Sequence, residues 1–251
     1  MIKNGGRNVA TQCAQLFSKP VPICRVLRSK FLLFLYLFLV GCASQSIDPF
    51  EGVNRGVSAV NHTADRFVLR PIAVGYEAVL PEPVELGVSN VFSNLADPWI
   101  ATNQLLQGKP DLSLQDFGRF LINSTIGVVG LFDVASHMGL EKHNEDFGQT
   151  LAVWGVESGP YIVVPFWGPT TLRDGAGSLL DSLAYVPRYI DHVPTRNVTI
   201  AVDLISRRAK LLDSEGLLTG DKYLFFRDAY LQQREYLIND GVVEDSFLDD
   251  E

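Results

Sequence analysis

The longest run of large apolar side chains in the chain spans ten residues, which limits how the chain can meet a membrane. This run, FLLFLYLFLV at Phe31 to Val40, follows a basic segment that contains no acidic residue. It is half of the roughly 20 residues that a membrane-spanning helix requires, and it matches the apolar core of a secretory signal peptide. Later apolar stretches, such as IGVVGLF and the Pro165-interrupted YIVVPFW, are shorter. We therefore predict a removable signal at residues 1–41 and no single straight helix that crosses a membrane.

The apolar run ends in four residues where an ordinary signal peptide would carry a small-x-small cleavage site. These residues are Leu39, Val40, Gly41 and Cys42. They resemble the bacterial lipobox, in which the Cys becomes the first residue of the mature protein and carries lipid chains. Each buried CH₂ of such a chain contributes about 0.8 kcal/mol, so two or three chains hold a protein on a membrane. We predict covalent lipid on Cys42, no other cofactor, and a lipidated tether at residues 42–47.

The other cysteines support this interpretation of Cys42. Cys13 and Cys24 lie in the predicted signal, so Cys42 would be the only thiol left in a compartment where thiols usually pair. The next residue is Ala43. In lipoproteins of this kind, an Asp at that position tends to retain the protein at the inner membrane. The predicted location is therefore the periplasmic face of the outer membrane.

The charge of the chain argues against a nucleic-acid partner. Six of the 21 Lys and Arg residues lie in the predicted signal, which leaves 15 against 29 Asp and Glu residues, or about −14. Binding nucleic acid needs a basic face, and no run of Lys or Arg follows residue 41. Residues 239–251 are predicted to form an acidic, disordered tail. Its expected role is solvation, with electrostatic steering of a basic carrier as the alternative.

Residues 48–238 are predicted to form a mainly α-helical domain, with room for one short hairpin. Asp48 and Pro49 suit a helix start, and apolar residues then recur every three or four positions from Phe50 to Phe67. Four further helices follow from capping residues and apolar spacing. The first runs from Asp97 and Pro98 to Gly108, and the second opens at Ser113 and Asp116. The third spans residues 195–216, and the fourth begins at Asp221.

One stretch in this domain is strand-like. It runs from Tyr161 to Trp167 between two glycine–proline breaks, and LAVWGV, just before it, is the predicted hairpin partner. Gly175 and Gly177 follow it in the segment DGAG, which lacks the spacing of a phosphate-binding loop. We expect these two glycines to let backbones approach closely.

The chain carries no recognisable catalytic constellation. GVSAV and GVSNV lack the closing glycine of the hydrolase turn G-x-S-x-G. In HMGLEKHNED, His137 and Glu141 are four residues apart and could share a metal on a helix. However, Gly139 weakens that helix, and no second pair of ligands follows. The segment is therefore predicted to be a solvated polar loop rather than a metal site.

Six stretches, in colinear order across nearly the whole mature chain, resemble the MlaA family, also called VacJ. They are DPFEGVNR (48–55), VLRPIAVGY (68–76), GVSNVFSNLADP (87–98), FGRFLINSTIGVVGLFDVA (117–135), FGQTLAVWGVESGPYIVVPFWGPTTLRD (147–174) and LLDSEGLL (211–218). Any one stretch would be weak support, whereas their shared order is specific.

The resemblance implies a ring-shaped helical lipoprotein, embedded in the inner leaflet of the outer membrane beside trimeric porins, with a central amphipathic channel. Phospholipids misplaced in the outer leaflet would pass through it to the soluble periplasmic carrier MlaC, and on to the MlaFEDB transporter. The implied function is removal of these lipids to maintain membrane asymmetry, without catalysis. Two alternatives stay open: a lipid-anchored phospholipid hydrolase, and a structural lipoprotein that braces the envelope.

Seven residues in the two glycine-flanked apolar stretches are candidates for the channel or for a lipid-facing surface. They are Gly127, Val128, Val129, Gly130, Tyr161, Phe166 and Trp167. Aromatic residues suit a membrane boundary, which favours this role over a catalytic loop. For Gly127 and Gly130, tight packing in a core is an equally good interpretation.

Overall fold

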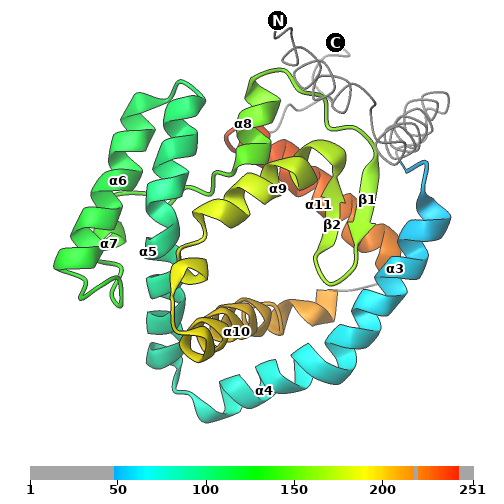
Figure 1. The fold of residues 1–251 in the computed structure, drawn as a ribbon, viewed down its shortest axis with the longest axis horizontal. Coiled ribbons are helices and arrows are strands. Elements are labelled where there is room, and N and C mark those ends of the chain that lie inside the picture. Colours follow the sequence, from blue (N-terminus) through cyan, green and yellow to red (C-terminus); the bar gives the residue numbers. More distant parts are fainter. Residues whose placement is uncertain (1–47, 218–219, 243–251) are drawn as a thin grey trace, which may run out of the picture. The chain divides into compact units, whose positions relative to one another are not determined.

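Helices dominate the structure, as the apolar spacing predicts (Figure 1). The computed structural model describes residues 48–217 and 220–242, and those from Phe50 onward belong to one unit. The predicted signal peptide, the tether with Cys42 and residues 243–251 of the acidic tail lie outside the described residues. For the part that is described, the mainly α-helical fold with one short hairpin is confirmed.

The hairpin is inserted between two helices in the middle of the unit. In chain order the elements are α3 (Glu51–Ala64), the π-helix η1 (Asp65–Leu69), α4 (Arg70–Val79), α5 (Glu82–Leu106), α6 (Pro110–Thr125), α7 (Val134–His137), α8 (Phe147–Val153), β1 (Tyr161–Val164), β2 (Gly168–Thr171), α9 (Leu172–Ala184), the 3₁₀-helix η2 (Val186–Tyr189), α10 (Val193–Ala209), the 3₁₀-helix η3 (Asp213–Leu217) and α11 (Lys222–Ile238).

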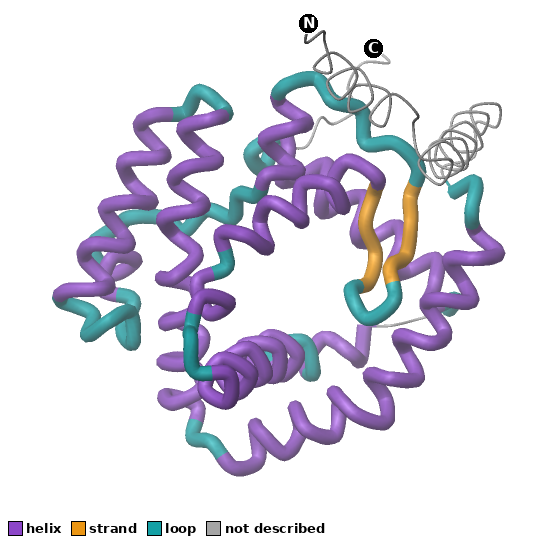
Figure 2. The backbone as a smooth tube through the Cα atoms, viewed as in Figure 1, coloured by secondary structure: helices purple, strands orange, loops and turns teal. Residues whose placement is uncertain are grey.

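Within residues 50–242, these elements contact one another in a closed cycle. α3 continues through η1 into α4, α4 packs on α10, and α10 packs on α5. α5 contacts α8, α8 contacts α9, and α9 contacts β2, whose partner β1 returns to α3. α11 braces the cycle against α8 and β2, while α6 packs on α5 and α7 on α6. The backbone of the unit therefore runs around a ring (Figure 2).

The structure corrects the helix start that was predicted at Asp97. α5 begins at Glu82 and carries Pro98 in its interior. Asp97 is buried and pairs with Lys142 instead of capping a helix. Pro98 has no N–H to donate to the carbonyl four residues earlier, but packing against α6 and α10 keeps the helix continuous. The predicted stop is confirmed, because the chain leaves the helix at Gly108, where φ is +82°.

Two other helix starts differ from prediction by a few residues. α3 begins at Glu51 rather than at Pro49, and α6 begins at Pro110 rather than at Ser113. Pro110 suits the first position of a helix because its fixed φ is helical and it lacks an N–H that would be unpaired there. Ser113 does not cap the helix, since its hydroxyl donates to the carbonyl of Ala101 on α5 at 2.7 Å. A hydrogen bond to a neighbouring helix has thus replaced the helix-capping hydrogen bond that was expected of Ser113.

The last two helices give one correction and one confirmation. α10 ends at Ala209 rather than at Gly216. The chain then forms the 3₁₀-helix η3, in which Glu215 forms an ion pair with Arg208 of α10. The predicted start of the final helix at Asp221 is confirmed, because the Asp221 side chain accepts hydrogen bonds from two backbone N–H groups in the first turn of α11.

The hairpin has a different partner strand from the one predicted. β1 pairs antiparallel with β2, so that Tyr161 faces Thr171 and Val164 faces Gly168. LAVWGV, the predicted partner, instead contains the end of α8 and the turn that follows it. The sequence of β2, GPTT, opens with Gly and Pro, which are uncommon in strands, so local propensity gave no sign of it.

α8 and α9 touch at a pair of glycines. A Cβ on Gly177 would lie 2.5 Å from the backbone nitrogen of Gly148, so only glycine fits at this position. The close approach predicted for Gly177 is confirmed. Gly175, on the same helix, would meet only the side chain of Thr170 at 3.5 Å, which is an ordinary contact. The close approach predicted for Gly175 is wrong.

Apolar side chains in this unit are distributed unlike those of a water-soluble domain. Among the described residues, 17 buried residues are polar or charged and only eight are apolar, whereas large apolar side chains are exposed along most helices. On α3 and η1, Val53, Val60 and Phe67 recur every seven residues and are 54% to 70% exposed. The apolar stripe of this segment therefore faces outward. No helix in the described ranges combines the length and the apolar character that crossing a bilayer requires.

Candidate functional site

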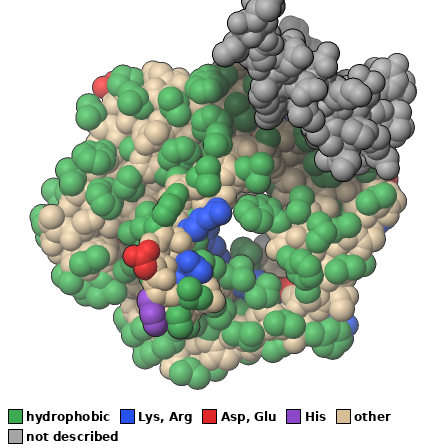
Figure 3. All heavy atoms as spheres, in the orientation of Figure 1, with side chains coloured by type: hydrophobic (Ala, Val, Ile, Leu, Met, Phe, Trp, Pro, Cys, Tyr) green, Lys and Arg blue, Asp and Glu red, His purple; other side chains and the backbone are tan. Residues whose placement is uncertain are grey.

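The centre of the ring is hollow and bordered by basic side chains. In the space-filling view, the surface is hollowed at the centre, and Lys and Arg side chains lie at its edge (Figure 3). A cavity of about 670 Å³, here called the large cavity, lies between α3, η1, the hairpin, the end of α10, η3 and the start of α11. Elements from both ends of the unit thus meet at this cavity.

Part of the large cavity is apolar and mostly aromatic. Its apolar lining consists of Tyr161, Val163, Leu211, Tyr223, Phe225 and Phe226. Tyr161 is only 2% exposed, and its ring lies edge-on to that of Tyr223, with 6.4 Å between their centroids. This wall can accept a hydrocarbon body without giving up a hydrogen bond.

The rest of the lining is polar and carries more basic than acidic groups. It contains His62, Arg66, Arg70, Arg208 and Lys222, against Asp65 and Glu215. Arg208 binds both oxygens of Asp65, at 2.6 and 2.9 Å, and also contacts Glu215. Arg70 Nε donates to Glu215 at 2.9 Å. Hydrogen bonds from Arg208 and then Arg70 lower the pKa of Glu215. Arginines therefore hold both carboxylates of the lining.

Two asparagines of α3 hold the hairpin in the ring. Asn54 Nδ2 donates to the Tyr161 carbonyl at 3.1 Å, and Asn54 Oδ1 accepts from the Val163 N–H at 2.9 Å. Asn61, seven residues later, repeats this pattern further along the hairpin with bonds of 3.0 and 2.8 Å. Asn54 therefore pairs with the outer edge of β1 as a neighbouring strand would, and Asn61 does the same at the end of β1 and the turn that follows. Since α3 and the hairpin are adjacent in the cycle, these four bonds close the ring.

The three aromatic candidates of the hairpin lie in two different places. Tyr161 lines the large cavity. Phe166 and Trp167 lie at the turn between β1 and β2, and they are 82% and 64% exposed. Phe166 has a φ of +61°, a conformation that side chains other than glycine rarely adopt. A lipid-facing role for Phe166 and Trp167 stays a prediction, which their exposure suits.

The second candidate stretch is a tight turn after α6. A Cβ on Gly127 would lie 2.2 Å from the carbonyl oxygen of Phe132, and one on Gly130 would lie 2.7 Å from the side chain of Asn94. These contacts favour the core-packing interpretation of both glycines. Val128 and Val129 have positive φ values and are exposed, and none of the four residues lines the large cavity.

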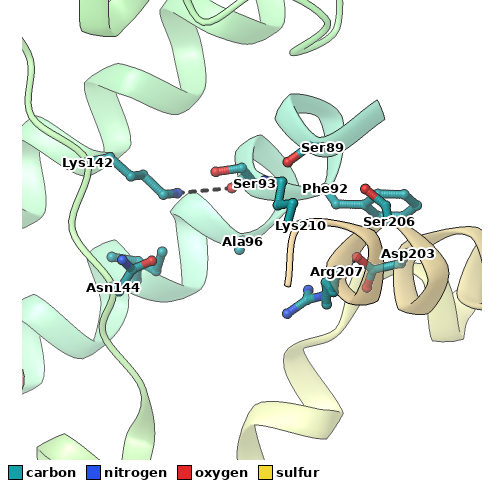
Figure 4. A pocket seen from close by; sticks show the side chains of 11 residues that line it. Ser89, Phe92, Ser93, Ala96, Lys142, Asn144, Asp203, Ser206, Arg207 and Lys210 are labelled. Carbon is teal, nitrogen blue, oxygen red and sulfur yellow. Dashed lines mark hydrogen bonds and ion pairs between the residues drawn. The ribbon is translucent and has the colours of Figure 1, made fainter. Parts of the chain in front are cut away.

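A smaller cavity, about 230 Å³, lies between α5, α10 and the segment before α8 (Figure 4). Its polar lining consists of Ser89, Ser93, Lys142, Asn144, Asp203, Ser206, Arg207 and Lys210. Lys142 Nζ donates to the carbonyl of Ser93 at 3.1 Å and pairs with Asp97. Burial raises the pKa of Asp97, and the Lys142 charge works against that rise. Lys142 is therefore fixed in place by a buried counter-charge.

The segment HMGLEKHNED is largely a loop, as predicted, and half of its residues are exposed, but several of its polar side chains pack against helices. His143 Nδ1 lies 2.9 Å from a carboxylate oxygen of Asp116, which is fully buried in α6. Glu145 accepts from Gln107 at 2.7 Å, and Asp146 accepts from Arg234. His137 and Glu141 do not come together with a third ligand, and no group of three His, Cys, Asp or Glu side chains suited to a metal occurs in the described residues.

The two asparagines of α3 and the basic groups of the large cavity were not predicted from the sequence. A signal did exist for Asn54 and Asn61, because a seven-residue spacing places both on one face of a helix among apolar neighbours. The basic lining had a partial signal, because His62, Arg66 and Arg70 recur every four residues, the spacing of one helix face. Arg208 and Lys222 come from segments far away in the chain, and only the ring brings them to the same cavity.

The chain is similar to known proteins over most of its length. A profile of the MlaA lipoprotein family matches residues 46–237. The intermembrane phospholipid transport system lipoprotein MlaA of Shigella flexneri is 37% identical over 215 residues, which cover 81% of this chain and 85% of the relative. The protein of that name from Escherichia coli K12 is 36% identical, with the same coverage. A solved structure described as "Structural basis for maintenance of bacterial outer membrane lipid asymmetry" matches this chain with a TM-score of 0.68 and 36% sequence identity. The match covers 76% of this chain and 99% of that one.

Proposed function

The chain belongs to the MlaA lipoprotein family, and from this premise we propose that it transports phospholipids between the membranes of a bacterial envelope. The resemblance carried by the six sequence stretches is thereby confirmed. The proposed transport removes misplaced phospholipids from the outer leaflet of the outer membrane and passes them to a periplasmic carrier, which maintains lipid asymmetry.

The observation that carries this proposal is the inverted distribution of polarity in the ring. Large apolar side chains are exposed along most of the helices, and Lys and Arg side chains lie at the edge of the hollow beside apolar ones (Figure 3). A lipid that moves through a protein needs an apolar surface for its chains and a hydrated path for its headgroup. The large cavity offers both within one space. Movement along such a path makes and breaks no covalent bond, so we propose transport without catalysis.

The location and partners of the protein form a finer part of this proposal. The predicted lipid on Cys42 would anchor the chain at the periplasmic face of the outer membrane. The exposed apolar faces of α3, η1 and α4 support immersion of the ring in one leaflet. The family resemblance supports a trimeric porin as a lateral partner and the soluble carrier MlaC as the acceptor of the lipid.

Substitution of the predicted lipid-bearing residue tests the anchor. Cys42→Ala should block acylation and leave an uncleaved precursor or misplaced protein, because the anchor depends on that thiol. The measurement is membrane fractionation together with mass determination of the purified chain. Normal processing and normal retention of the variant in the outer membrane would contradict the predicted anchor.

The transport itself is tested by measuring outer-leaflet phospholipid in cells with and without the gene. Cells that lack the protein should accumulate phospholipid there, and the wild-type chain should reverse this. Ser58 lines the large cavity and is half-buried, so Ser58→Trp should fill the cavity and fail to complement. Ala59, the next residue, is exposed and does not line the cavity, so Ala59→Trp is the matched control.

The two alternative functions give different results in the same strains. A hydrolase would release fatty acid from phospholipid when the purified protein is assayed in detergent micelles. A structural brace would leave outer-leaflet phospholipid unchanged when the gene is deleted. Either result, obtained at normal protein levels, would contradict the proposed transport and favour the corresponding alternative function.

A further inference from the structure

Three basic side chains of the large cavity form no ion pair with a carboxylate among the described residues. Within residues 48–217 and 220–242, Arg66 forms no ion pair, and its guanidinium lies 5.6 Å from the ring centroid of Phe67. Lys222 Nζ lies 3.5 Å from Nε2 of the His62 imidazole. Arg66, Lys222 and His62 are all exposed and line the cavity. Basic groups that face a cavity without a counter-charge favour an anionic ligand.

The neighbours of these groups restrict the ligand to an amphiphile. Phe225 and Phe226 lie three and four residues after Lys222 on α11 and line the same cavity, with 5.9 Å between their ring centroids. A small inorganic anion would gain nothing from this apolar wall, whereas a lipid body would. A guanidinium and an ammonium both bind phosphate oxygens through charge-assisted hydrogen bonds. The matching chemistry is a phosphate ester attached to a hydrocarbon body.

We infer that the large cavity selects phospholipids with net negative headgroups, and that Arg66, Lys222 and His62 set this preference. The inference rests on the proposed phospholipid transport. The lining has four Lys and Arg side chains against two carboxylates, Asp65 and Glu215. Arginines already hold both carboxylates. The ammonium of a zwitterionic headgroup would therefore meet excess positive charge and no unoccupied carboxylate in the described lining, a repulsion that a headgroup bearing only hydroxyls avoids.

The test compares ligands that differ in headgroup or lack the lipid body. Full-length acylated protein in detergent micelles is titrated calorimetrically with dihexanoyl phosphatidylglycerol, dihexanoyl phosphatidylethanolamine and inorganic phosphate. We expect phosphatidylglycerol to bind about tenfold more tightly than phosphatidylethanolamine, the size of effect that one charge-assisted hydrogen bond produces. Inorganic phosphate should bind more weakly than either lipid. Phosphate binding as tight as that of phosphatidylglycerol would overturn the assignment to a lipid headgroup.

Variants of the basic groups connect this preference to the cavity. Arg66→Gln combined with Lys222→Gln should bring the ratio of the two lipid affinities close to one, and each single change should lower it about threefold. Arg66→Lys keeps the charge and should keep the preference. Arg188 is exposed, lies outside the cavity and hydrogen-bonds to Ser182 at 3.5 Å, so Arg188→Gln is the matched control. A preference that survives both Gln substitutions in a folded variant would overturn the inference.

A transfer assay separates this inference from the proposed function. Transfer of total phospholipid from donor to acceptor vesicles measures transport, and the ratio of transferred headgroups measures selectivity. Wild-type protein that transfers phosphatidylglycerol and phosphatidylethanolamine at equal rates, and binds them equally in micelles, refutes the selectivity and leaves transport standing. Wild-type protein that transfers neither lipid refutes transport, and the micelle titration then decides the selectivity of the cavity independently.

Discussion

Arg119 of α6 is the largest fully buried side chain in the described part of the chain, and its charge is neutralised locally. Its Nη2 donates to both oxygens of Asp133, at 3.0 Å each, and Nη1 donates to the Ser136 hydroxyl at 3.0 Å and to the Leu140 carbonyl. Asn123 adds a hydrogen bond to Asp133 at 2.9 Å. A buried guanidinium with these partners holds α7 and the segment after it against α6.

Removing the carboxylate from this cluster should destabilise the fold. Asp133→Asn should lower the free energy of unfolding by about 2 to 3 kcal/mol at neutral pH, because the buried Arg119 loses its counter-charge. Denaturant unfolding in detergent micelles measures the change. Asp191 is exposed, so Asp191→Asn is the control and should change the free energy by less than about 0.5 kcal/mol. Equal stability of the two variants would contradict the structural role of Asp133.

The same variant should reveal a pH dependence with a defined sign. Burial alone would raise the pKa of Asp133, but hydrogen bonds from Ser136, Asn123 and Arg119 outweigh it and lower the pKa to about 2. An unfolded Asp has a pKa of about 3.9. Ionised Asp133 therefore stabilises the fold above about pH 4, and that stabilisation is lost as the pH falls through about 2. The difference between wild type and Asp133→Asn should shrink over this interval, and a constant difference would show that the carboxylate charge is not its cause.

At the scale of elements, local sequence signals predicted helices well but failed where a tertiary contact took over. Asp221 caps α11 as expected, because an N-cap needs only the next few residues. Asp97 carries the same type of signal but is buried against Lys142 inside α5. The second strand was missed because its pairing with β1 and packing on α9 and α11, rather than its propensity, make it a strand.

The contact between α8 and α9 gives an element-scale prediction with an internal control. Gly177→Ala should lower the free energy of unfolding by about 1 to 3 kcal/mol, because the new methyl group would overlap the backbone of Gly148. Gly175→Ala meets only ordinary contacts and should be neutral or stabilise the helix by up to about 1 kcal/mol. Thermal unfolding of both variants in micelles provides the comparison. The same direction of change in both would mean that the close approach does not limit Gly177.

The pairing of α3 with β1 predicts a second effect at this scale. Asn54→Leu keeps the size of a side chain that is 1% exposed but leaves the Val163 N–H and the Tyr161 carbonyl without their amide partner. The hairpin should then open more readily, by about 1 to 3 kcal/mol, and hydrogen exchange at Val163 should accelerate. Asn197→Leu, on the exposed side of α10, is the control. Unchanged exchange at Val163 would show that the amide does not hold the hairpin.

At the scale of the whole unit, the ring could not be derived from spacing or composition, although the family resemblance implied it. The basic residues of the large cavity look in the sequence like solvated charges, because a four-residue spacing such as that of His62, Arg66 and Arg70 is also typical of the exposed face of a helix. The closed cycle of contacts brings residues 58–70, 161–169, 208–215 and 222–226 to one cavity. Tyr161 was predicted for that surface because an aromatic strand residue stands out locally, whereas Arg66 and Lys222 do not.

The outward apolar faces should make the ring bind membranes even without an acyl chain. The segment from Asp48 to Glu251 lacks the predicted signal and Cys42, so any binding to phosphatidylcholine vesicles must come from the unit itself. Val60 and Phe67 are 54% and 70% exposed on the outer stripe of α3 and η1. Burying one such side chain contributes about 1.5 to 3 kcal/mol. Val60→Glu combined with Phe67→Glu should therefore reduce vesicle partitioning by at least about 100-fold.

The control for this loss must add the same charges without removing apolar surface. Gln232 and Gln233 are exposed polar residues of α11, and Gln232→Glu with Gln233→Glu should leave partitioning within about twofold of the unsubstituted segment. Vesicle flotation measures all three proteins, and uncharged vesicles keep electrostatic repulsion out of the comparison. An unsubstituted segment that stays monomeric in detergent-free buffer and does not float with vesicles would show that the stripe faces water.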